Sequence, residues 1–317
     1  MIRIGIIGMG IIASAHTKAI SKISDFELVA ISEINEERAK EYSKDLGVPY
    51  YTDYKEMCEK EKPDAVIINL PHFLHCESTV FCLEKGIHVL CEKPMANTVE
   101  ECDKMIAASE KSGAKLIIGH IQRFFQGIGA IKEYIDNGTL GKLVTISEVR
   151  NEYYFADARP RWFLDKKLAG GGIIINHGAH GIDKILYTVG EDITNVHGEC
   201  GNFYREEFDV EGHANISFRA NGIPCTISLC GYETFFSNQI TYTFTHGALR
   251  SDNSGLHICD EKGGTFRKLE LPEPEYGPFE YQLIEFAKAI RGEESISPDG
   301  YYGRKVIETI EKVYAEN

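Results

Sequence analysis

The stretch HVLCEKPMA, residues 88–96, holds a lysine where a bound substrate could meet it. An apolar segment expected to be a buried strand is followed at once by Glu92, Lys93 and Pro94. Pro94 fixes its own φ and favours extended geometry at the residue before it. Proton transfer needs a side chain held within hydrogen-bond reach of the reacting atom. We therefore expect Lys93 to act as an acid–base residue.

A second set of chemically active side chains lies in GGGIIINHGAHGIDKILY, residues 170–187. On a helix, one apolar stripe would hold Ile175, Ala179, Ile182 and Leu186, and the adjacent stripe would hold Asn176, His180, Asp183 and Tyr187. These polar residue types bind ligands and move protons, whereas a solvated stripe more often carries Lys and Glu. The alternative is a half-buried polar face that satisfies its own hydrogen bonds.

The third set would bind a dinucleotide. An apolar run, Ile2–Ile7, leads into Gly8-Met9-Gly10-Ile11-Ile12-Ala13, which fits G-x-G-x-x-A after a strand and before a helix. Gly8 would permit the tight turn, Gly10 would let a pyrophosphate approach the backbone, and Ala13 would let helix and strand pack closely. The N–H groups at the helix N-terminus favour the phosphates.

Glu33 follows a second expected strand, FELVAIS at 26–32, and stands 23 residues after Gly10. A carboxylate there would bind a ribose 2′-hydroxyl and repel a 2′-phosphate, so it favours NAD. Arg38 is close enough in sequence to keep NADP as an alternative. The other interpretation of Glu33 is a solvated charge that opens the next helix.

The elements that must position these residues alternate in the first 120 residues. We expect strands at 2–7, 26–32, 50–51, 64–70, 87–91 and 115–120, and helices at 35–47, 54–60, 76–86 and 98–113, the last with Asn97 as N-cap and Glu100 as its partner. This alternation predicts a doubly wound parallel sheet, an α/β Rossmann fold. Ligands of such sheets bind at the carboxyl ends of the strands, where Lys93 would lie.

After residue 120 the pattern changes to β-rich segments. We expect strands at 143–150, 196–205, 210–220, 224–232 and 239–246, and helices at 121–138, 278–292 and 303–317. These predict an α+β domain with an open, largely antiparallel sheet. The 317 residues suit two domains, a dinucleotide-binding domain at 1–120 and a substrate and oligomerisation domain at 121–317. The C-terminal helices are candidates to pack back on the first domain.

Composition excludes several classes of function. The net charge of −14 and pI of about 5.3 argue against binding of nucleic acid. Nine cysteines without a CxxC pair indicate reduced thiols and a cytoplasmic protein. The N-terminus resembles a signal peptide, but its three glycines disfavour an apolar helix, so we expect it to be retained as the first strand. No apolar run reaches the roughly 20 residues needed to span a bilayer, so no membrane partner is expected.

Two histidine pairs at i, i+3 raise the question of a metal. They are His72 with His75 and His177 with His180. Together they would supply only nitrogen ligands, and the carboxylates near them have other expected roles. We expect no metal site.

These motifs together resemble the Gfo/Idh/MocA oxidoreductases, named after glucose-fructose oxidoreductase and inositol dehydrogenase. The resemblance rests on G-x-G-x-x-A, the acid after the second strand, PHFLH at 71–75, CEKP at 91–94 and the Arg123–Phe124 pair that opens the second domain. The family motif GGG-x-x-x-D-x-G-x-H-x-x-D is matched by Gly170, Gly171, Gly172, Gly178, His180 and Asp183. Asn176 stands where many members carry Asp, and Asn cannot hold a charge.

The resemblance implies an NAD(P)-dependent dehydrogenase or reductase that acts on CH–OH groups of a sugar, cyclitol or related polyol, in a homodimer or homotetramer. It implies Lys93 and His180 as catalytic residues, with the order of proton transfer left open. The expected substrate residues are Lys93, Gln122, Asn176 and His180. The expected cofactor residues are Gly8, Gly10, Ile11, Ile12, Glu33, Asn69, Pro71, His75, Glu92 and Lys93.

Three questions stay open on the sequence alone. A non-catalytic dinucleotide sensor of the same fold would regulate a partner instead of turning over a substrate. A dihydrodiol dehydrogenase or biliverdin-reductase-like enzyme would differ only in its substrate. Arg159 or Arg161 could bind a substrate carboxylate or phosphate, or both could be surface charges.

Overall fold

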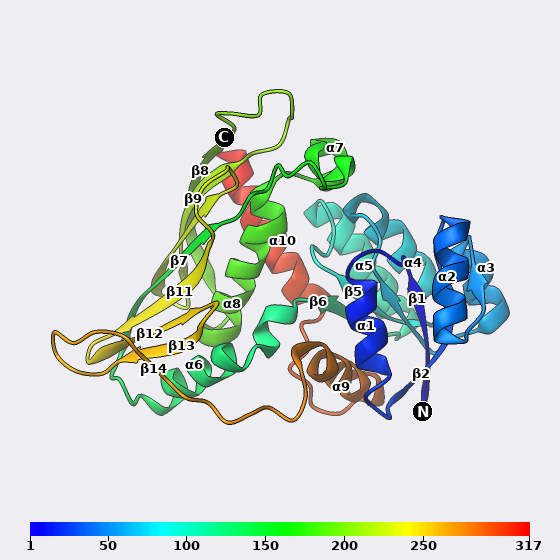
Figure 1. Ribbon diagram of the computed structural model, residues 1–317, viewed down its shortest axis with the longest axis horizontal. Coiled ribbons are helices and arrows are strands. Elements are labelled where there is room, and N and C mark those ends of the chain that lie inside the picture. The colour runs from blue at the N-terminus through cyan, green and yellow to red at the C-terminus, as the bar shows by residue number, and fades with distance from the viewer. The chain divides into compact units, whose positions relative to one another are not determined.

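A computed structural model describes residues 1–317, which form two compact units. The first unit contains residues 1–121 and 276–304, and the second contains residues 122–275 and 305–317. The chain therefore returns to the first unit near its C-terminus and then ends in the second. Figure 1 shows the elements of both units in chain order.

The first unit is built on a six-stranded sheet in which every paired strand is parallel. Its strands are β1 (Ile2–Ile7), β2 (Phe26–Ser32), β3 (Tyr50–Tyr51), β4 (Ala65–Ile68), β5 (His88–Glu92) and β6 (Leu116–Gly119). They lie in the order β3-β2-β1-β4-β5-β6, so the direction of winding reverses between β1 and β4. This is the doubly wound topology that the alternating pattern predicts, and sheets of this kind bind ligands at the carboxyl ends of the strands where the winding reverses.

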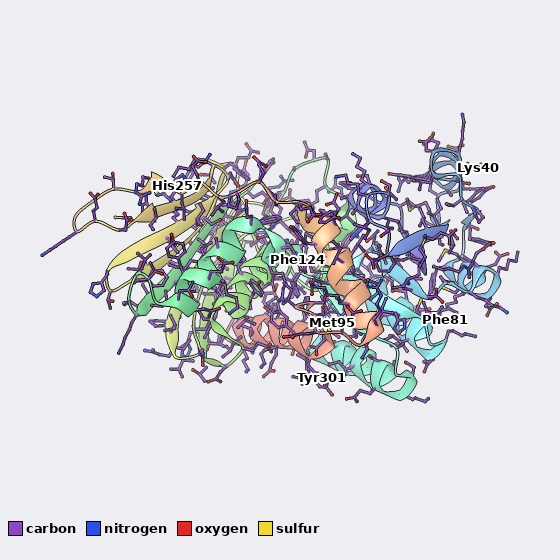
Figure 2. The ribbon with its side chains drawn as sticks, turned by 90° about the horizontal axis from the view of Figure 1, so that it is seen from below. Lys40, Phe81, Met95, Phe124, His257 and Tyr301 are labelled. Carbon is purple, nitrogen blue, oxygen red and sulfur yellow. The ribbon has the colours of Figure 1, made fainter.

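Helices pack on this sheet with caps that the sequence largely encodes. They are α1 (Ala13–Ile20), α2 (Glu36–Leu46), α3 (Tyr54–Glu61), α4 (His75–Glu84), α5 (Val99–Ser112) and α9 (Pro278–Arg291). Lys40 lies on the outer side of α2 (Figure 2).

The predicted cap of α5 is wrong by one residue. Thr98 is the N-cap and its hydroxyl accepts the N–H of Glu101, while the Glu101 carboxylate accepts the N–H of Asn97.

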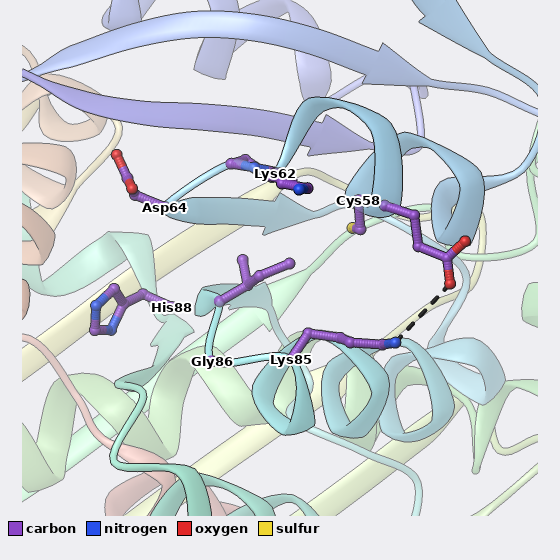
Figure 3. A pocket seen from close by; sticks show the side chains of 9 residues that line it. Cys58, Lys62, Asp64, Lys85, Gly86 and His88 are labelled. Atoms are coloured by element: carbon purple, nitrogen blue, oxygen red, sulfur yellow. Dashed lines mark ion pairs between the residues drawn. The ribbon is translucent and has the colours of Figure 1, made fainter.

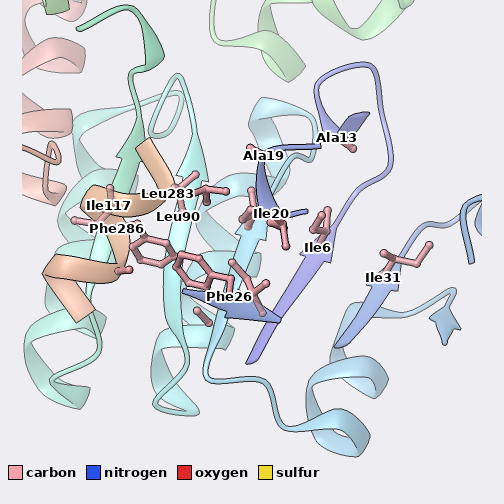
Figure 4. Packing of buried hydrophobic residues seen from close by; sticks show 14 of the residues in the cluster. Ile6, Ala13, Ala19, Ile20, Phe26, Ile31, Leu90, Ile117, Leu283 and Phe286 are labelled. Carbon is pink, nitrogen blue, oxygen red and sulfur yellow. The ribbon is translucent and has the colours of Figure 1, made fainter. Parts of the chain in front are cut away.

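The core of the first unit joins strands from the N-terminal half to helix α9 (Figure 4). Phe26 of β2 stacks on Phe286 of α9, with ring centroids 5.9 Å apart. Both rings are buried, together with Ile6 and Leu90 from neighbouring strands and Leu283 from α9. The contact fixes a segment more than 250 residues along the chain against the second strand, so this unit cannot be cut off at residue 121 without exposing its core.

The second unit is built on an eight-stranded sheet ordered β14-β13-β12-β11-β7-β10-β9-β8. Its strands are β7 (Leu143–Asn151), β8 (Ile193–Gly201), β9 (His213–Ala220), β10 (Ile223–Cys230), β11 (Ser237–Phe244), β12 (Gly247–Asp252), β13 (Gly255–Cys259) and β14 (Arg267–Lys268). All neighbours are antiparallel except β7 and β10, which confirms the largely antiparallel prediction. The last three strands were not predicted.

Helices cover one face of the second sheet. They are α6 (Gln126–Asn137), α8 (Ala179–Val189) and the C-terminal part of α10 (Gly300–Ala315), while the single turn α7 (Lys166–Ala169) lies in the chain between β7 and α8. Along β9 the alternate residues Ala214, Ile216 and Phe218 are buried, whereas Asn215 and Ser217 between them are exposed. None of the helices in either unit is long and apolar enough to cross a membrane.

Candidate active site

The predicted cofactor residues of the first unit meet at the carboxyl edge of its sheet. Gly8, Gly10, Ile11 and Ile12 follow β1, Glu33 follows β2, Asn69, Pro71 and His75 follow β4, and Glu92 and Lys93 close β5. These four strands are adjacent and parallel, so their carboxyl ends lie side by side. The loops therefore form one continuous rim.

The glycine loop has the shape that a pyrophosphate requires. Gly8 has a φ of 90°, and a Cβ there would come within 2.9 Å of the Asn69 carbonyl oxygen. A Cβ on Gly10 would meet no protein atom within 4 Å, so the backbone there opens onto free space. Ile11 is 92% exposed and α1 begins at Ala13. An open backbone beside a helix N-terminus fits the phosphates of a dinucleotide.

Glu33 is buried and held by backbone donors. Its Oε2 accepts the N–H of Met9 in the glycine loop at 3.0 Å, and its Oε1 accepts the N–H of Asn35 at 2.9 Å. Arg38 Nη1 lies 3.6 Å from Oε2. The carboxylate is thus fixed next to the glycine loop, with one cation beside it.

The loop after β5 is held by a buried ion pair that sequence reasoning missed. Glu92 Oε1 lies 2.9 Å from His16 Nε2 of α1, and Glu92 Oε2 accepts the N–H of Lys93 at 3.2 Å. Burial alone would raise the pKa of Glu92, but the hydrogen bond and charge of His16, with the charge of Lys93, bring it below the ordinary value. A Cβ on Gly119 would approach Glu92 Cα to 3.0 Å, so that glycine leaves the room that Glu92 needs.

Lys93 differs from its neighbours in exposure. Every other residue from Cys91 to Ala96 is buried, while Lys93 is half-buried. The peptide bond between Lys93 and Pro94 is cis. The loop therefore presents one ammonium group from an otherwise packed segment.

His75 joins the loop after β4 to the loop after β5. Its ring nitrogens lie 2.8 Å from the carbonyl oxygens of Pro94 and Leu70. Burial lowers the pKa of His75, so the neutral ring donates to one of these carbonyls at a time. No group of three or more His, Cys, Asp or Glu side chains in the chain is arranged to hold a metal ion.

In the second unit, the polar residues expected on one helix lie on two types of helix. Residues Ile174–Gly178 form a π-helix, and α8 continues from Ala179, whose N–H bonds to the carbonyl of Ile174 five residues earlier. Asn176 and His180 are 5% and 7% exposed, and the apolar stripe is buried as well. Since the helix is buried on nearly all sides, its polar stripe also packs against protein.

Part of that polar stripe is structural. Asp183 forms a buried ion pair with Arg123, whose guanidinium lies 5.1 Å from the ring centroid of Tyr187. Lys184 pairs with Glu148 of β7 at 3.0 Å, again in the interior. The self-satisfying alternative thus describes Asp183, and it explains why the Arg123 motif and the Asp183 motif occur together.

The three glycines before the π-helix allow two close approaches. A Cβ on Gly171 would collide with the Tyr314 hydroxyl of α10 at 2.0 Å, and one on Gly172 with the Glu211 carbonyl oxygen at 2.2 Å. The Glu211 carboxylate accepts the N–H groups of Gly172 and Ile174 and the hydroxyl of Tyr314. Glu211 thus fixes the start of the helix that carries Asn176.

A polar cluster lies beside Asn176 in the same unit. Tyr154 is fully buried, and its ring centroid is 5.8 Å from that of His177. Burial raises the pKa of Tyr154, whereas Arg159 and a hydrogen bond with Asn176 lower it. The Arg159 guanidinium lies 4.2 Å from the Tyr154 ring centroid. Gln122, the remaining predicted substrate residue, is buried in a short 3₁₀ turn, Ile121–Phe124.

A hollow in the first unit lies elsewhere. It has a volume of about 450 Å³ and is lined by residues at the amino ends of β4 and β5, among them Cys58, Lys62, Asp64, Lys85 and His88 (Figure 3). This is the edge of the sheet opposite the glycine loop and Lys93. The hollow is therefore separate from the candidate active site.

Comparison with known proteins identifies both units. Residues 2–120 match the model of an oxidoreductase family with an NAD-binding Rossmann fold, and residues 128–250 match the GFO/IDH/MocA C-terminal domain. The myo-inositol 2-dehydrogenase of Thermotoga maritima is 32% identical over 66% of this chain and 61% of its own length. The glucose-6-phosphate 3-dehydrogenase of Bacillus subtilis is 35% identical over 46% of this chain and 41% of its own.

A solved structure extends the likeness to the whole chain. The aldose-aldose oxidoreductase of Caulobacter crescentus, complexed with glycerol, superposes with a TM-score of 0.89 at 25% identity and covers 99% of this chain and 96% of that one. The aligned parts of the two sequence relatives span less than two thirds of their lengths, whereas this structure is matched almost throughout. With its glycine loop, its Glu-Lys-Pro loop and its open second sheet, the chain belongs to the Gfo/Idh/MocA family of oxidoreductases.

Proposed function

We propose that the protein is an NAD-dependent dehydrogenase or reductase that acts on a CH–OH or keto carbon of a sugar, cyclitol or related polyol. The observation that carries the proposal is the half-buried Lys93 on a loop held by His16, Glu92 and His75, beside the glycine loop. The names of the two relatives, an inositol and a sugar phosphate dehydrogenase, favour polyhydroxylated substrates.

Lys93 and His180 share the proton of the reacting hydroxyl in this proposal. One of them takes or returns the proton, and the other holds the oxygen as charge develops on it. Asn176 exchanges no proton, so its amide orients a substrate hydroxyl, with Gln122 as a second polar contact. NAD, when bound, accepts or supplies the hydride.

The cofactor contacts follow the rim of the first sheet. Gly8, Gly10, Ile11 and Ile12 approach the pyrophosphate, and Glu33 accepts a ribose hydroxyl. Asn69, Pro71 and His75 line the loop after β4, and Glu92 supports Lys93. Because Glu33 repels a 2′-phosphate, NAD is preferred to NADP.

In this proposal, residues 1–120 bind the cofactor. Residues 121–317 bind the substrate and form the subunit contacts of a homodimer or homotetramer. The experiment is a panel of cyclitols, aldoses and sugar phosphates incubated with NAD, with reduction followed by absorbance. Turnover of at least one polyol is expected. Tight NAD binding with no turnover across the panel would favour the dinucleotide sensor instead.

A further inference from the structure

Arg150 and Arg159 in the second unit each have a buried N–H group without an acceptor within the protein. Arg150 at the end of β7 is 8% exposed, and its Nε and Nη2 lie 3.2 and 3.0 Å from Glu152 Oε2. Its third nitrogen, Nη1, is buried and has no protein acceptor. A buried donor left in this state costs free energy unless another group accepts from it.

Arg159 is the second of these arginines. Its guanidinium lies 4.2 Å from the centroid of the Tyr154 ring and 5.1 Å from that of Phe163. Its Nε is buried and has no acceptor in the protein. A guanidinium stacked on a ring keeps its donor edge free for a planar oxyanion.

The local charge is positive in a strongly acidic protein. Glu152 is the carboxylate that faces both Arg150 and Arg159, and its Oε2 also lies 3.4 Å from His177 Nδ1. Two fixed positive charges thus share one negative charge, while the whole chain carries −14. Tyr154, on whose ring Arg159 stacks, hydrogen-bonds with Asn176, and the charge of Glu211 also acts on it.

We propose that Arg159, assisted by Arg150, forms a subsite for an anionic group, a carboxylate or a phosphate, on the sugar-type substrate. This inference rests on the proposed function, because it assigns a substrate class to the site that contains Asn176. Arg161 has a different role. It is exposed, lies 5.7 Å from the Phe208 ring, and has no part in the subsite.

The only tryptophan of the chain provides a direct test. Trp162 lies three residues after Arg159 and stacks on Phe163, with ring centroids 3.7 Å apart. The full-length protein is titrated with D-glucuronate, D-glucose 6-phosphate and D-glucose, and tryptophan fluorescence is recorded. We expect a saturable change in fluorescence with at least one anionic sugar at concentrations where glucose causes none. Comparing the responses to glucuronate and glucose 6-phosphate shows whether a carboxylate or a phosphate is recognised.

Variants then assign the response to Arg159. Hydrogen bonds to a charged group correspond to about 10–100-fold in affinity, so Arg159→Gln should weaken the binding of the anionic sugar by a factor of that size. Arg159→Lys should retain part of the affinity, and Arg161→Gln, the matched control, should retain all of it. If Arg159→Gln does not fold, displacement of the anionic sugar from the wild-type protein by inorganic phosphate decides instead.

The outcomes separate this inference from the proposed function. Saturable binding lost in Arg159→Gln, without NAD reduction by any sugar, would support the subsite and refute the dehydrogenase. Turnover in which anionic and neutral sugars have equal kcat/KM, or no fluorescence response to either anion, would overturn the subsite and leave the dehydrogenase. Turnover with a kcat/KM preference for the anionic sugar that disappears in Arg159→Gln would support both.

Discussion

Lys93 owes its position to neighbours that are far from it in sequence. Glu92 is held by His16, 76 residues earlier, and Pro94 is held through its carbonyl by His75. Gly119 leaves the space that Glu92 occupies. The loop that carries the lysine is therefore supported by residues other than the lysine itself, and the chemistry of Lys93 can be tested separately from the support of the loop.

Replacing Lys93 by methionine keeps the apolar stem and removes the proton-carrying group. We expect kcat to fall about 10²–10⁴-fold, the usual contribution of a general acid–base residue, with little change in NAD affinity. Steady-state kinetics and cofactor titration measure the two effects. Lys104→Met, which removes an exposed lysine paired with Glu100 on α5, should be neutral. A Lys93→Met enzyme with near wild-type kcat would make the lysine structural.

Replacing His16 by alanine tests the support of that loop. The lowered pKa of Glu92 contributes stability above the ordinary glutamate range, and this stability is lost as pH falls through the folded-state pKa. Without His16, burial raises that pKa, so the variant should be less stable than the wild type at neutral pH, and the difference should shrink as pH falls. Urea unfolding between about pH 3 and 6 measures the difference. His197→Ala, from an exposed His–Glu pair, is the control, and superimposable pH profiles for His16→Ala would exclude the role.

The proposed preference for NAD over NADP depends on Glu33. We expect NADH to bind more tightly than NADPH, because the fixed carboxylate faces the position of a 2′-phosphate. Glu33→Ser should narrow or reverse the difference, since Arg38 would then be released from its 3.6 Å contact with the carboxylate. Fluorescence titration with both reduced cofactors gives the two dissociation constants. Equal or tighter binding of NADPH to the wild type would refute the assignment.

At the scale of helices and strands, the sequence predicts the bounds of those elements that are fixed by interactions between nearby residues. Strands β1 and β2 begin and end where the apolar runs do, and α2 is bounded by Asn35 and Gly47 as its caps require. The strands after residue 246 were missed because they are short, six, five and two residues long, which leaves little alternation to recognise. The π-helix was missed because nothing in its composition distinguishes it from an α-helix.

The site was predictable only in part, for the same reason. The glycine loop, Glu33 and Lys93 are local motifs at strand ends. Glu92 contacts His16 and Glu211 contacts Gly172 across 76 and 39 positions of sequence. No pattern of residue spacing predicts contacts between residues so far apart. Arg159 was recognised as a candidate, but only its stacking on Tyr154 and its buried Nε distinguish it from Arg161.

The turn before the π-helix gives a test of element stability. Glu211→Ala would leave the N–H groups of Gly172 and Ile174 and the hydroxyl of Tyr314 without their acceptor. Each buried donor left unsatisfied costs about 1–3 kcal/mol, so the free energy of unfolding should fall by roughly 3 kcal/mol or more. Urea denaturation measures it. Glu206→Ala, at an exposed position of the same loop, should change it by less than about 0.5 kcal/mol, and equal losses would remove Glu211 from this role.

At the scale of the whole molecule, the second sheet presents a flat row of small hydroxyl side chains. Ser217, Thr226, Ser147 and Thr241 are neighbours across β9, β10, β7 and β11, and none is buried. Short side chains let two sheets approach to the usual spacing of about 10 Å. We therefore expect this face to join copies of the chain into the proposed homodimer or homotetramer.

Light scattering after size exclusion should give a mass of two or four times 35.6 kDa. Arginine at both Ser217 and Thr226 would place charge in the middle of the row and should shift the mass towards one chain. Glu37→Arg on the exposed side of α2 adds the same side chain elsewhere and should leave the mass unchanged. A monomeric wild type would contradict the expectation directly.

The π-helix at Ile174–Gly178 makes this helix tolerant of a particular kind of change. A π-turn accommodates one residue more than an α-turn, so deleting one residue there would let the segment relax into regular α-helix, with the residues on either side still facing as before. A one-residue deletion within α8 would instead rotate every side chain before it by about 100° relative to those after it. For protein engineers, the π-turn is therefore the place in this helix where a codon can be removed without turning its two ends against each other.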